Sequence, residues 1–453
     1  MKTIITSLQI GAKVNKTFWK NIQKFKKEHG VVEVLAFVMN GQYVDDPMHP
    51  SVAKLVQSGE LQLVERQQYN LHKKVKMYDT KVLAQNINCL HGQSDKLPEK
   101  YSYIMPGTKV RFFTVANIGT NPRFFQSTGA MTEPHYVTVA RSSNKRVKRG
   151  IQATEQHQLG FVYFQDNGRG KFDTYNVTAQ KGGNFHYLKE KYHSGKISKA
   201  EVEVLVLGDI HHGVTNKYAR AKYLKQIETL NPNYVVLHDF FDGESINHHN
   251  RHNLIDRIRN AGTVKDSLES ELKSLSKEMN YLSNRFPEVE FIVAESNHDA
   301  FLRTYVKGGD FHDDYINYIM GTRILLSIYD DLSKKVLEES LKFVGKIPKN
   351  FKFLRENDSF KIRGVQLAQH GHKGSNGARG SALTFKRLNL KMISGHTHSP
   401  QIYSNGMIVG TNTILEQGYT IGGASSWMHA NGILYPDGTF SLLTFTAKQP
   451  VVR

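Results

Sequence analysis

Five short blocks of residues that can bind metals occur in order in the second half of the chain. They read LVLGDIHHG (205–213), VVLHDFFDG (235–243), FIVAESNHD (291–299), VQLAQHGHKG (365–374) and MISGHTHSP (392–400). The first four follow apolar runs of the kind that form buried strands. Together the blocks supply carboxylate, imidazole and amide groups, a mixed set that suits a pair of divalent cations acting on phosphate. One block alone would be an ordinary turn or surface histidine, but five in order indicate a metal-dependent phosphoester hydrolase.

The spacing within the blocks suits metal ligands. Asp209 and His211 are two residues apart after a strand, where an extended backbone points both side chains the same way. Asp239 follows the second strand, and its two carboxylate oxygens can each hold one cation. The remaining blocks add an amide and three imidazoles: Asn297, His370, His396 and His398. Two cations held in this way could share a hydroxide that attacks phosphorus in line.

The elements around these blocks predict an α/β domain. Apolar strands alternate with helices after Glu201, and open α/β sheets place their ligands beyond the carboxyl ends of the strands. Leucine and methionine recur at spacings of three and four between the second and third blocks: Leu268, Leu272, Leu275, Met279 and Leu282. This stripe favours a crossover helix on the sheet over a coiled-coil seam. The residues 431–445 predict a hairpin around Pro436-Asp437-Gly438.

The first part of the chain has a different pattern. Residues 1–40 predict strand, helix and strand, and residues 100–190 predict mainly strands separated by turns. A polar, basic segment at 188–201 marks the boundary. We therefore expect a basic α+β region over 1–199, open to division into subdomains 1–95 and 96–199, and a catalytic domain over 200–453.

Charge is unevenly distributed between these two parts. Residues 1–200 hold 30 Lys and Arg against 14 Asp and Glu, a net of +16, whereas the remaining 30 and 27 give a net of only +3. Such asymmetry favours a polyanionic partner. The single cysteine, Cys89, permits no intrachain disulfide. The N-terminus lacks an adequate apolar signal core and no run reaches the length of a membrane span, so we expect a cytoplasmic protein without a membrane partner.

The blocks D-x-H, D-x-x-D, N-H-D, H-G-H and G-H-T-H resemble the calcineurin-like metallophosphoesterase superfamily over residues 201–450. The resemblance implies a two-sheet sandwich flanked by helices with two divalent metals, Mn²⁺ first and Fe or Zn as alternatives. It assigns the first metal to Asp209, His211, Asp239 and His398, and the second to Asp239, Asn297, His370 and His396. His298 would stabilise the phosphate or protonate the leaving oxygen, and Asp242 would orient His298.

This chain departs from the family pattern at three positions. His238 and Ser296 stand where the family has glycines before the bridging Asp and the Asn. Gly243 stands where the protein phosphatases of this superfamily have an arginine that grips a phosphate monoester. That third departure argues against a phosphoprotein phosphatase. The fourth block also leaves a choice between His370 and His372, which we resolve in favour of His370 because it ends the strand.

A basic cluster in the first part favours nucleic acid as the substrate. Segment 141–150 holds five cations: Arg141, Lys145, Arg146, Lys148 and Arg149. They are either a solvated loop or a clamp for the phosphate backbone. Lys373 and Arg379, after the fourth block, are two further candidates for phosphate contacts. Nearby aromatic residues alternate as strand interiors do, so we expect most of them to be core rather than a stacking surface for bases.

These observations predict a metal-dependent DNA nuclease, similar in kind to the bacterial SbcD exonuclease and, more loosely, to phage-encoded early enzymes of the superfamily that degrade DNA. A nucleotide or small-molecule phosphodiesterase is the alternative enzyme. A non-catalytic scaffold is the third reading, which the intact ligand set and His298 oppose. The residues leave open a homo-oligomer and an ATPase partner.

Overall fold

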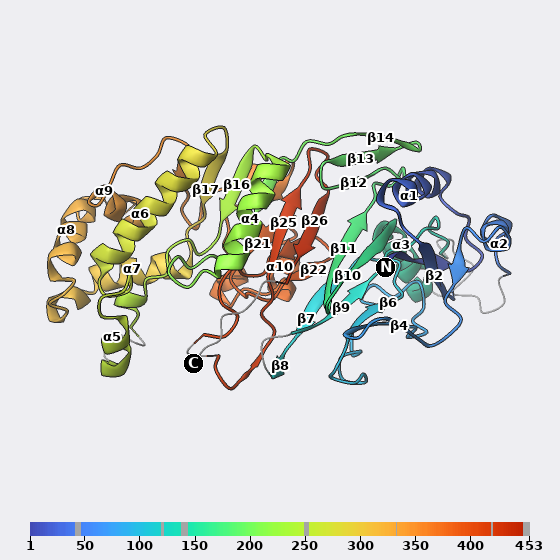
Figure 1. The fold of residues 1–453 in the computed structure, drawn as a ribbon, viewed down its shortest axis with the longest axis horizontal. Helices are drawn as coiled ribbons and strands as arrows, with labels where there is room; N and C mark the ends of the chain where they lie inside the picture. Colours follow the sequence, from blue (N-terminus) through green and yellow to red (C-terminus); the bar gives the residue numbers. More distant parts are fainter. Residues whose placement is uncertain are drawn as a thin grey trace. The chain divides into compact units, whose positions relative to one another are not determined.

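The computed structural model describes residues 1–40, 47–118, 122–136, 144–248, 253–331, 333–417 and 420–446. By its internal contacts the chain divides into two compact units. Unit 1 comprises Met1–Val202, Ser399–Met407 and Glu416–Thr446, and unit 2 comprises Glu203–His398 and Ile408–Leu415. Both units mix helices with sheets, which confirms the predicted α/β class (Figure 1).

Unit 1 is mainly β-structure. Its helices are α1 (Lys16–His29), α2 (Pro50–Gln57) and α3 (Asn144–Glu155). Its strands before residue 200 are β1 (Lys2–Gln9), β2 (Glu33–Met39), β3 (Gln62–Leu63), β4 (Gln68–His72), β5 (Val75–Tyr78), β6 (Ser102–Met105), β7 (Phe112–Val115), β8 (Asn117–Ile118), β9 (Arg123–Ser127), β10 (Gly160–Gly168), β11 (Lys171–Thr178), β12 (Phe185–Tyr187), β13 (Glu190–His193) and β14 (Lys196–Lys199). Its late strands are β22 (Gln401–Tyr403), β23 (Gly406–Ile408), β24 (Ala424–Ser425), β25 (Ala430–Leu434) and β26 (Phe440–Thr444).

Two sheets build most of unit 1. One runs in the order β25-β26-β11-β10-β1-β2-β3, and the other in the order β23-β22-β7-β9-β6-β5-β4. β1 and β2 pair in parallel on either side of α1, as the strand–helix–strand pattern predicts. The predicted hairpin at the end of the chain is also present, as the antiparallel pair β25–β26.

Helix α1 shows why unit 1 has a core of its own. Asn15 caps its first turn, because its side chain accepts a hydrogen bond from the Phe18 backbone, and Gly30 ends it with a left-handed φ of 61°. Phe18, Trp19, Ile22 and Phe25 lie on the buried face. They pack with the aromatic side chains of β10, so most aromatics in this region are core, as the alternation predicts.

Unit 2 has the alternating order of an α/β domain. Its strands are β15 (Val204–Val206), β16 (Tyr234–Leu237), β17 (Glu290–Val293), β18 (Phe351–Phe353), β19 (Lys361–Ile362), β20 (Val365–Gln366) and β21 (Met392–Ser394). Its helices are α4 (Lys217–Leu230), α5 (Leu254–Asn260), α6 (Leu268–Arg285), α7 (Asn297–Lys307), α8 (Tyr318–Ile328), α9 (Val336–Lys342) and α10 (Ala382–Arg387), with 3₁₀ turns η1 (Glu244–Ile246), η2 (Asp310–Asp313) and η3 (Ser375–Gly377).

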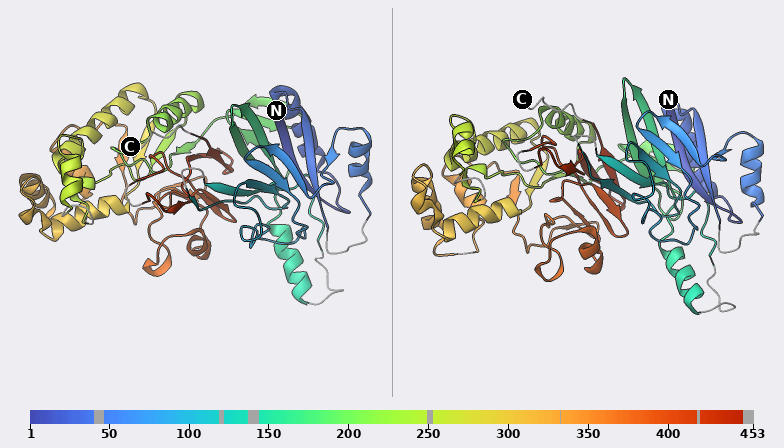
Figure 2. Two further views of the ribbon diagram at one scale, coloured as in Figure 1. Left: turned by 60° about the horizontal axis from the view of Figure 1, so that its bottom comes forward. Right: turned by 90° about the horizontal axis from the view of Figure 1, so that it is seen from below.

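Strands β15 to β18 form a parallel sheet in the order β18-β17-β16-β15, and β19, β20 and β21 are neighbours in a second sheet. The strands β15, β16 and β17 are almost wholly buried, which explains their continuous apolar sequences. α6 is the predicted crossover helix, and its stripe from Leu268 to Leu282 is buried. Helices α5, α7 and α8 lie together at one end of the unit in both views of Figure 2.

Candidate metal centre

All five ligand blocks follow strand ends in unit 2. Asp209 lies three residues after β15, Asp239 two residues after β16, and Asn297 begins the helix that follows β17. The last two blocks follow β20 and β21, which are parallel neighbours. Because parallel strands end at the same edge of a sheet, side chains from distant parts of the sequence converge there. The prediction that the first four blocks follow strands is confirmed, and the fifth block also follows a strand, β21.

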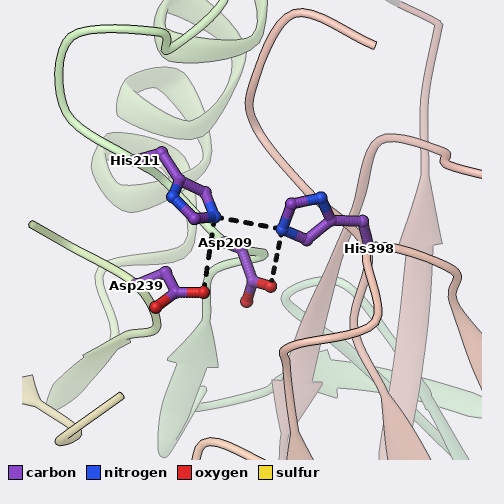
Figure 3. A group of neighbouring side chains, drawn as sticks. All are labelled: Asp209, His211, Asp239 and His398. Carbon is purple, nitrogen blue, oxygen red and sulfur yellow. Dashed lines mark hydrogen bonds and ion pairs between the residues drawn. The ribbon is translucent and has the colours of Figure 1, made fainter. Parts of the chain in front are cut away.

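Four of the predicted ligands form one buried group (Figure 3). Nε2 of His398 lies 3.1 Å from Oδ2 of Asp209 and 3.0 Å from Nε2 of His211. Nε2 of His211 lies 3.3 Å from Oδ2 of Asp239. Two imidazole nitrogens therefore face each other between two carboxylates. A divalent cation would interact favourably with all four groups at once, which the groups cannot do with one another.

A second group shares Asp239 with the first. Nε2 of His370 lies 3.0 Å from Oδ2 of Asp239, and His396 completes the group of three. Oδ1 of Asn297 lies 3.1 Å from Nε2 of His370 and 3.0 Å from Nδ1 of His396. The seven residues predicted as ligands therefore come together, and Asp239 occupies the position that a bridging carboxylate needs.

The backbone is strained where the ligands stand. His211, Asp239, His396 and His398 all have positive φ, between 42° and 76°. Non-glycine residues seldom adopt this region, which costs roughly 1–3 kcal/mol per residue. Strain of this kind is characteristic of sites whose geometry serves a function.

Charge within the cluster is balanced by contacts between its members. Burial alone would raise the pKa of Asp209, but His370 and His398 outweigh it and lower that pKa to about 2. Burial likewise opposes protonation of His211, yet Asp239 and Asp242 raise its pKa to about 10. The pKa of Asp239 is well below its usual range, against the effect of burial, because His370, His298 and His211 surround it. The carboxylates are therefore ionised in the folded protein, as metal ligands must be.

The donor set fits divalent metals. Oδ1 of Asp209 and Oδ1 of Asp239 are buried and have no hydrogen-bond partner among the described residues. A buried carboxylate oxygen without a partner is costly, and a cation would remove that cost. Carboxylate, imidazole and amide groups are the ligands of Mn²⁺, Fe and Zn.

The structure reveals supporting residues that the sequence did not identify. A Cβ atom at Gly395 would lie 2.2 Å from Oδ1 of Asp209 and 3.0 Å from Cβ of His238, so only glycine leaves room for Asp209. Thr411 Oγ1 donates to the Asp209 carbonyl at 3.0 Å, and the Asn412 side chain donates to the Gly208 carbonyl at 2.9 Å. These contacts join residues about two hundred positions apart in the sequence, so no local sequence pattern predicts them.

Asp242 does not orient His298 through its carboxylate, as the family resemblance implied. Its carboxylate Oδ1 lies 3.2 Å from Nδ1 of His211, and Oδ2 lies 3.2 Å from Nζ of Lys265. Nδ1 of His298 instead donates to the backbone carbonyl of Asp242. The reason is geometric: Asp242 is held by Lys265, a residue the sequence did not point to, and faces the first metal group.

His298 lies beside the candidate ligands, and only one of its ring nitrogens, Nδ1, contacts Asp242. Its ring lies 4.4 Å from the ring of His211, centroid to centroid. A carbonyl oxygen can only accept, so Nδ1 of His298 carries the hydrogen and Nε2 faces away from that contact. Burial lowers the pKa of His298, so its neutral form dominates near neutral pH.

The structure shows the surroundings of each of the three departures from the family pattern. Ser296 caps α7: its hydroxyl accepts from His298 and Asp299 backbone amides, and the Asp299 side chain accepts from the Ser296 amide. His238 is fully buried, with its ring 5.5 Å from that of His370. Gly243 has a φ of 68°, and a Cβ there would lie 2.8 Å from the Phe241 ring, which disfavours an arginine at this position.

The fourth block separates its two histidines. His370 joins the ligand group, whereas Nε2 of His372 lies 3.3 Å from Oε1 of Glu356. A hollow of about 670 Å³ opens beside His370 and is lined by both rings and by Arg303, Arg355 and Lys373. Nζ of Lys373 lies 2.7 Å from Oε2 of Glu356, so this predicted phosphate contact is already ion-paired. Arg379 is exposed and pairs with Lys373 through the backbone.

The predicted basic cluster belongs to unit 1, and its described part, from residue 144 onward, is helical rather than a loop. Lys145, Lys148 and Arg149 are exposed on α3. Arg141 lies outside the described residues, and so does the side chain of Arg146. Among the described residues, no helix has the length and apolar character that a membrane crossing requires.

Comparison with known proteins shows what residues 202–400 are similar to. The model of the family described as calcineurin-like phosphoesterase matches residues 202–400. Protein A1 of Escherichia phage T5 is 29% identical over 339 residues, which are 71% of this chain and 59% of that protein. The chain therefore spans less than two-thirds of the length of this relative. The crystal structure of Chaetomium thermophilum Vps29 matches 41% of this chain and 94% of its own, at 12% identity and a TM-score of 0.24.

The family match covers all five blocks, and the buried Asp and His cluster stands where those blocks meet. Residues 202–400 are therefore similar to the calcineurin-like phosphoesterases, the family that the ligand blocks resemble.

Proposed function

We propose that this protein hydrolyses phosphodiester bonds in DNA with two divalent metal ions. The observation that carries the proposal is the pair of ligand groups that share Asp239. Asp209, His211 and His398 would hold one ion with Asp239, and Asn297, His370 and His396 would hold the other. Bound there, the ions, Mn²⁺ by preference, would activate water and stabilise negative charge on the phosphate.

The chain's own residues complete the chemistry. Nδ1 of His298 is held by the Asp242 carbonyl, so Nε2 would first take up a proton and then, as the imidazolium, pass it to the leaving oxygen. Asp242 fixes the ring of His211, and the capped start of α7 fixes Asn297. Gly243 supplies no side chain to grip the extra charge of a phosphate monoester, which favours a diester as substrate.

The charge of unit 1 supports a polynucleotide rather than a small ester. Net charge is +16 over residues 1–200 and +3 over the rest. Three cations of α3, Lys145, Lys148 and Arg149, are exposed. Helix α1 presents Lys16, Lys20 and Lys27 to solvent with no acidic residue in its first turn. When a polyanion binds such a surface, the counterions that surround it are released. Its affinity is therefore higher at low salt. Similarity to a phage protein agrees with the phage-encoded character that the sequence suggested.

The substrate class is tested with the purified chain and Mn²⁺. Linear, nicked and single-stranded DNA, RNA and bis-p-nitrophenyl phosphate are offered in parallel, with Asp209→Asn as the inactive control. We expect cleavage of DNA that is lost in the control. Turnover of the small ester with every polynucleotide left intact would instead identify a nucleotide or small-molecule phosphodiesterase.

The role of α3 is tested by salt dependence. Replacing Lys145, Lys148 and Arg149 with Gln should weaken DNA binding and reduce the slope of log affinity against log salt by about 0.7–0.9 for each lost phosphate contact. The matched control removes three cations that are each paired with a glutamate in unit 2, Lys225, Lys273 and Lys342. Equal slopes in the wild type and the α3 variant would remove α3 from the DNA-binding surface.

A further inference from the structure

Helix α8 is apolar on both of its faces. Met320, Ile324 and Ile328 are buried in unit 2, whereas Ile319 and Leu326 are 61% and 62% exposed. Arg323 is the only charged residue between 318 and 328. One apolar face is enough to pack a helix onto its own domain. A helix that is apolar on both faces is therefore typical of a buried helix. The exposed apolar residues of α8 therefore indicate a surface that binds a partner.

The outer residues of α8 continue on both flanks with regular spacing. Tyr315 is 89% exposed before the helix, and Tyr329 is 69% exposed at its end. The series Tyr315, Ile319, Thr322, Leu326, Tyr329 advances by four, three, four and three residues. From Ile319 to Tyr329 this is the heptad spacing by which helices pack side by side, and Tyr315 lies in the turn that precedes the helix.

Helix α5 extends the same surface. Ile258 of α5 and Ile316 line one hollow of about 230 Å³, and Arg257 pairs with Asp314 at 3.7 Å, so the two segments adjoin. Figure 1 places both helices at the same end of unit 2. The exposed apolar residues of this surface, called the α5/α8 face below, are Leu254, Ile255, Ile258, Tyr315, Ile316, Tyr318, Ile319, Leu326 and Tyr329.

The size of the α5/α8 face matches a stable interface. At about 150–250 Å² for a large side chain, the exposed fractions of the nine residues leave on the order of 1,000 Å² of apolar surface. The largest apolar patch on a monomeric protein is about 300–600 Å². A standard interface takes about 800 Å² from each partner. The face is thus too large for an ordinary monomer surface and sufficient for one half of a dimer.

We propose that the α5/α8 face binds a second copy of this chain about a twofold axis. The series on α8 reads the same in both directions: aromatic, aliphatic, threonine, aliphatic, aromatic. In an antiparallel pair centred on Thr322, Ile319 lies opposite the partner's Leu325, beside the partner's Leu326, and Tyr315 lies opposite the partner's Tyr329. Such a surface is complementary to itself, as a twofold interface requires. The proposal stands independently of the DNA substrate.

Molar mass tests the proposal directly. Light scattering after size exclusion, over a wide range of protein concentration, should give the mass of two 51.5-kDa chains. The double variant Ile319→Glu/Leu326→Glu should give the mass of one chain and keep a native circular dichroism spectrum, since both side chains are exposed. The matched control is Leu383→Glu, an exposed leucine on α10, which should remain dimeric.

Cysteine crosslinking tests the orientation. The native Cys89 is buried, so Thr322→Cys introduces a single accessible thiol. Mild oxidation should join two Thr322→Cys chains, whereas Tyr218→Cys on α4 should stay uncrosslinked at the same concentration. A monomeric wild type, including one that acquires a different protein at this face, would overturn the proposal. So would a dimer that survives the Ile319→Glu/Leu326→Glu change.

Discussion

The carboxylate of Asp242 lies 3.2 Å from Nδ1 of His211, and Nε2 of the same ring faces Asp239 at 3.3 Å. One carboxylate thus fixes the ring orientation while the other shares the ligand group. Groups that orient a ligand histidine commonly contribute 10- to 100-fold to metal affinity.

Asp242→Asn should therefore weaken Mn²⁺ binding by about 10- to 100-fold, measured by calorimetric titration. The matched control is Asp437→Asn, which alters another aspartate held 3.2 Å from a histidine, His186, in unit 1. If Asp242 acted through His298 instead, metal affinity would be unchanged and only the turnover rate would fall.

Metal binding should release protons from His211. In the metal-free protein Asp239 and Asp242 overcome the opposing effect of burial and raise the pKa of His211 to about 10. A metal takes only the neutral imidazole, so binding displaces the proton at any pH below about 10. Affinity should rise with pH across the neutral range, by up to about tenfold per unit for one proton. Calorimetry in two buffers of different ionisation enthalpy counts the protons released. Equal apparent enthalpies in the two buffers would contradict the prediction.

Gly395 should tolerate no side chain. Gly395→Ala places a Cβ 2.2 Å from Oδ1 of Asp209, so either the carboxylate or the backbone must move. We expect Mn²⁺ affinity and hydrolysis of bis-p-nitrophenyl phosphate to fall together by at least about tenfold, since a ligand is displaced. Gly182→Ala, where a Cβ meets nothing within 4 Å, is the control. Wild-type activity in Gly395→Ala would show that Asp209 has room to shift.

The sequence predicted which residues come together because each of the seven candidate ligands lies within five residues of the end of a strand. An apolar run followed by Asp209 or Asp239 predicts a buried strand and also a polar side chain at its carboxyl end. Parallel pairing of the strands then brings these side chains together. The order of the blocks was thus sufficient to predict that the seven candidate ligands converge, and the spacing of leucines was sufficient to predict α6.

The parts that the sequence did not predict depend on distant contacts. Lys265 reaches Asp242 from a turn with no motif, and Thr411 reaches Asp209 across two hundred residues. The predicted contact between the Asp242 carboxylate and His298 was wrong for the same reason. A family resemblance pairs two residues but does not give which of their atoms are in contact. Likewise, the β25–β26 hairpin was recognised, but its place in unit 1 follows from the pairing of Leu443 with Tyr175.

A buried histidine of unit 1 should make stability depend on pH. Nε2 of His157 donates to the Thr132 carbonyl at 2.8 Å, and Nδ1 lies 3.0 Å from the Tyr136 hydroxyl. Burial is the main cause that lowers the pKa of His157, to about 4, and Lys109 contributes in the same direction. An unfolded histidine titrates near 6.5, so between about pH 6.5 and 4 the unfolded chain binds the extra proton. His157 therefore stabilises the fold fully above about pH 6.5 and loses that contribution as the pH falls.

The loss amounts to about 3 kcal/mol by pH 4, from the difference between the two pKa values. Urea unfolding, followed above pH 7 and again near pH 5, measures it. His157→Gln removes the titrating group, so the variant should lose less stability than the wild type between the two conditions, although it is less stable at neutral pH. His91→Gln, which removes an exposed histidine from the same unit, is the control. An identical decline in wild type and His157→Gln would mean that His157 is protonated in the fold without cost, against its two hydrogen bonds and its burial.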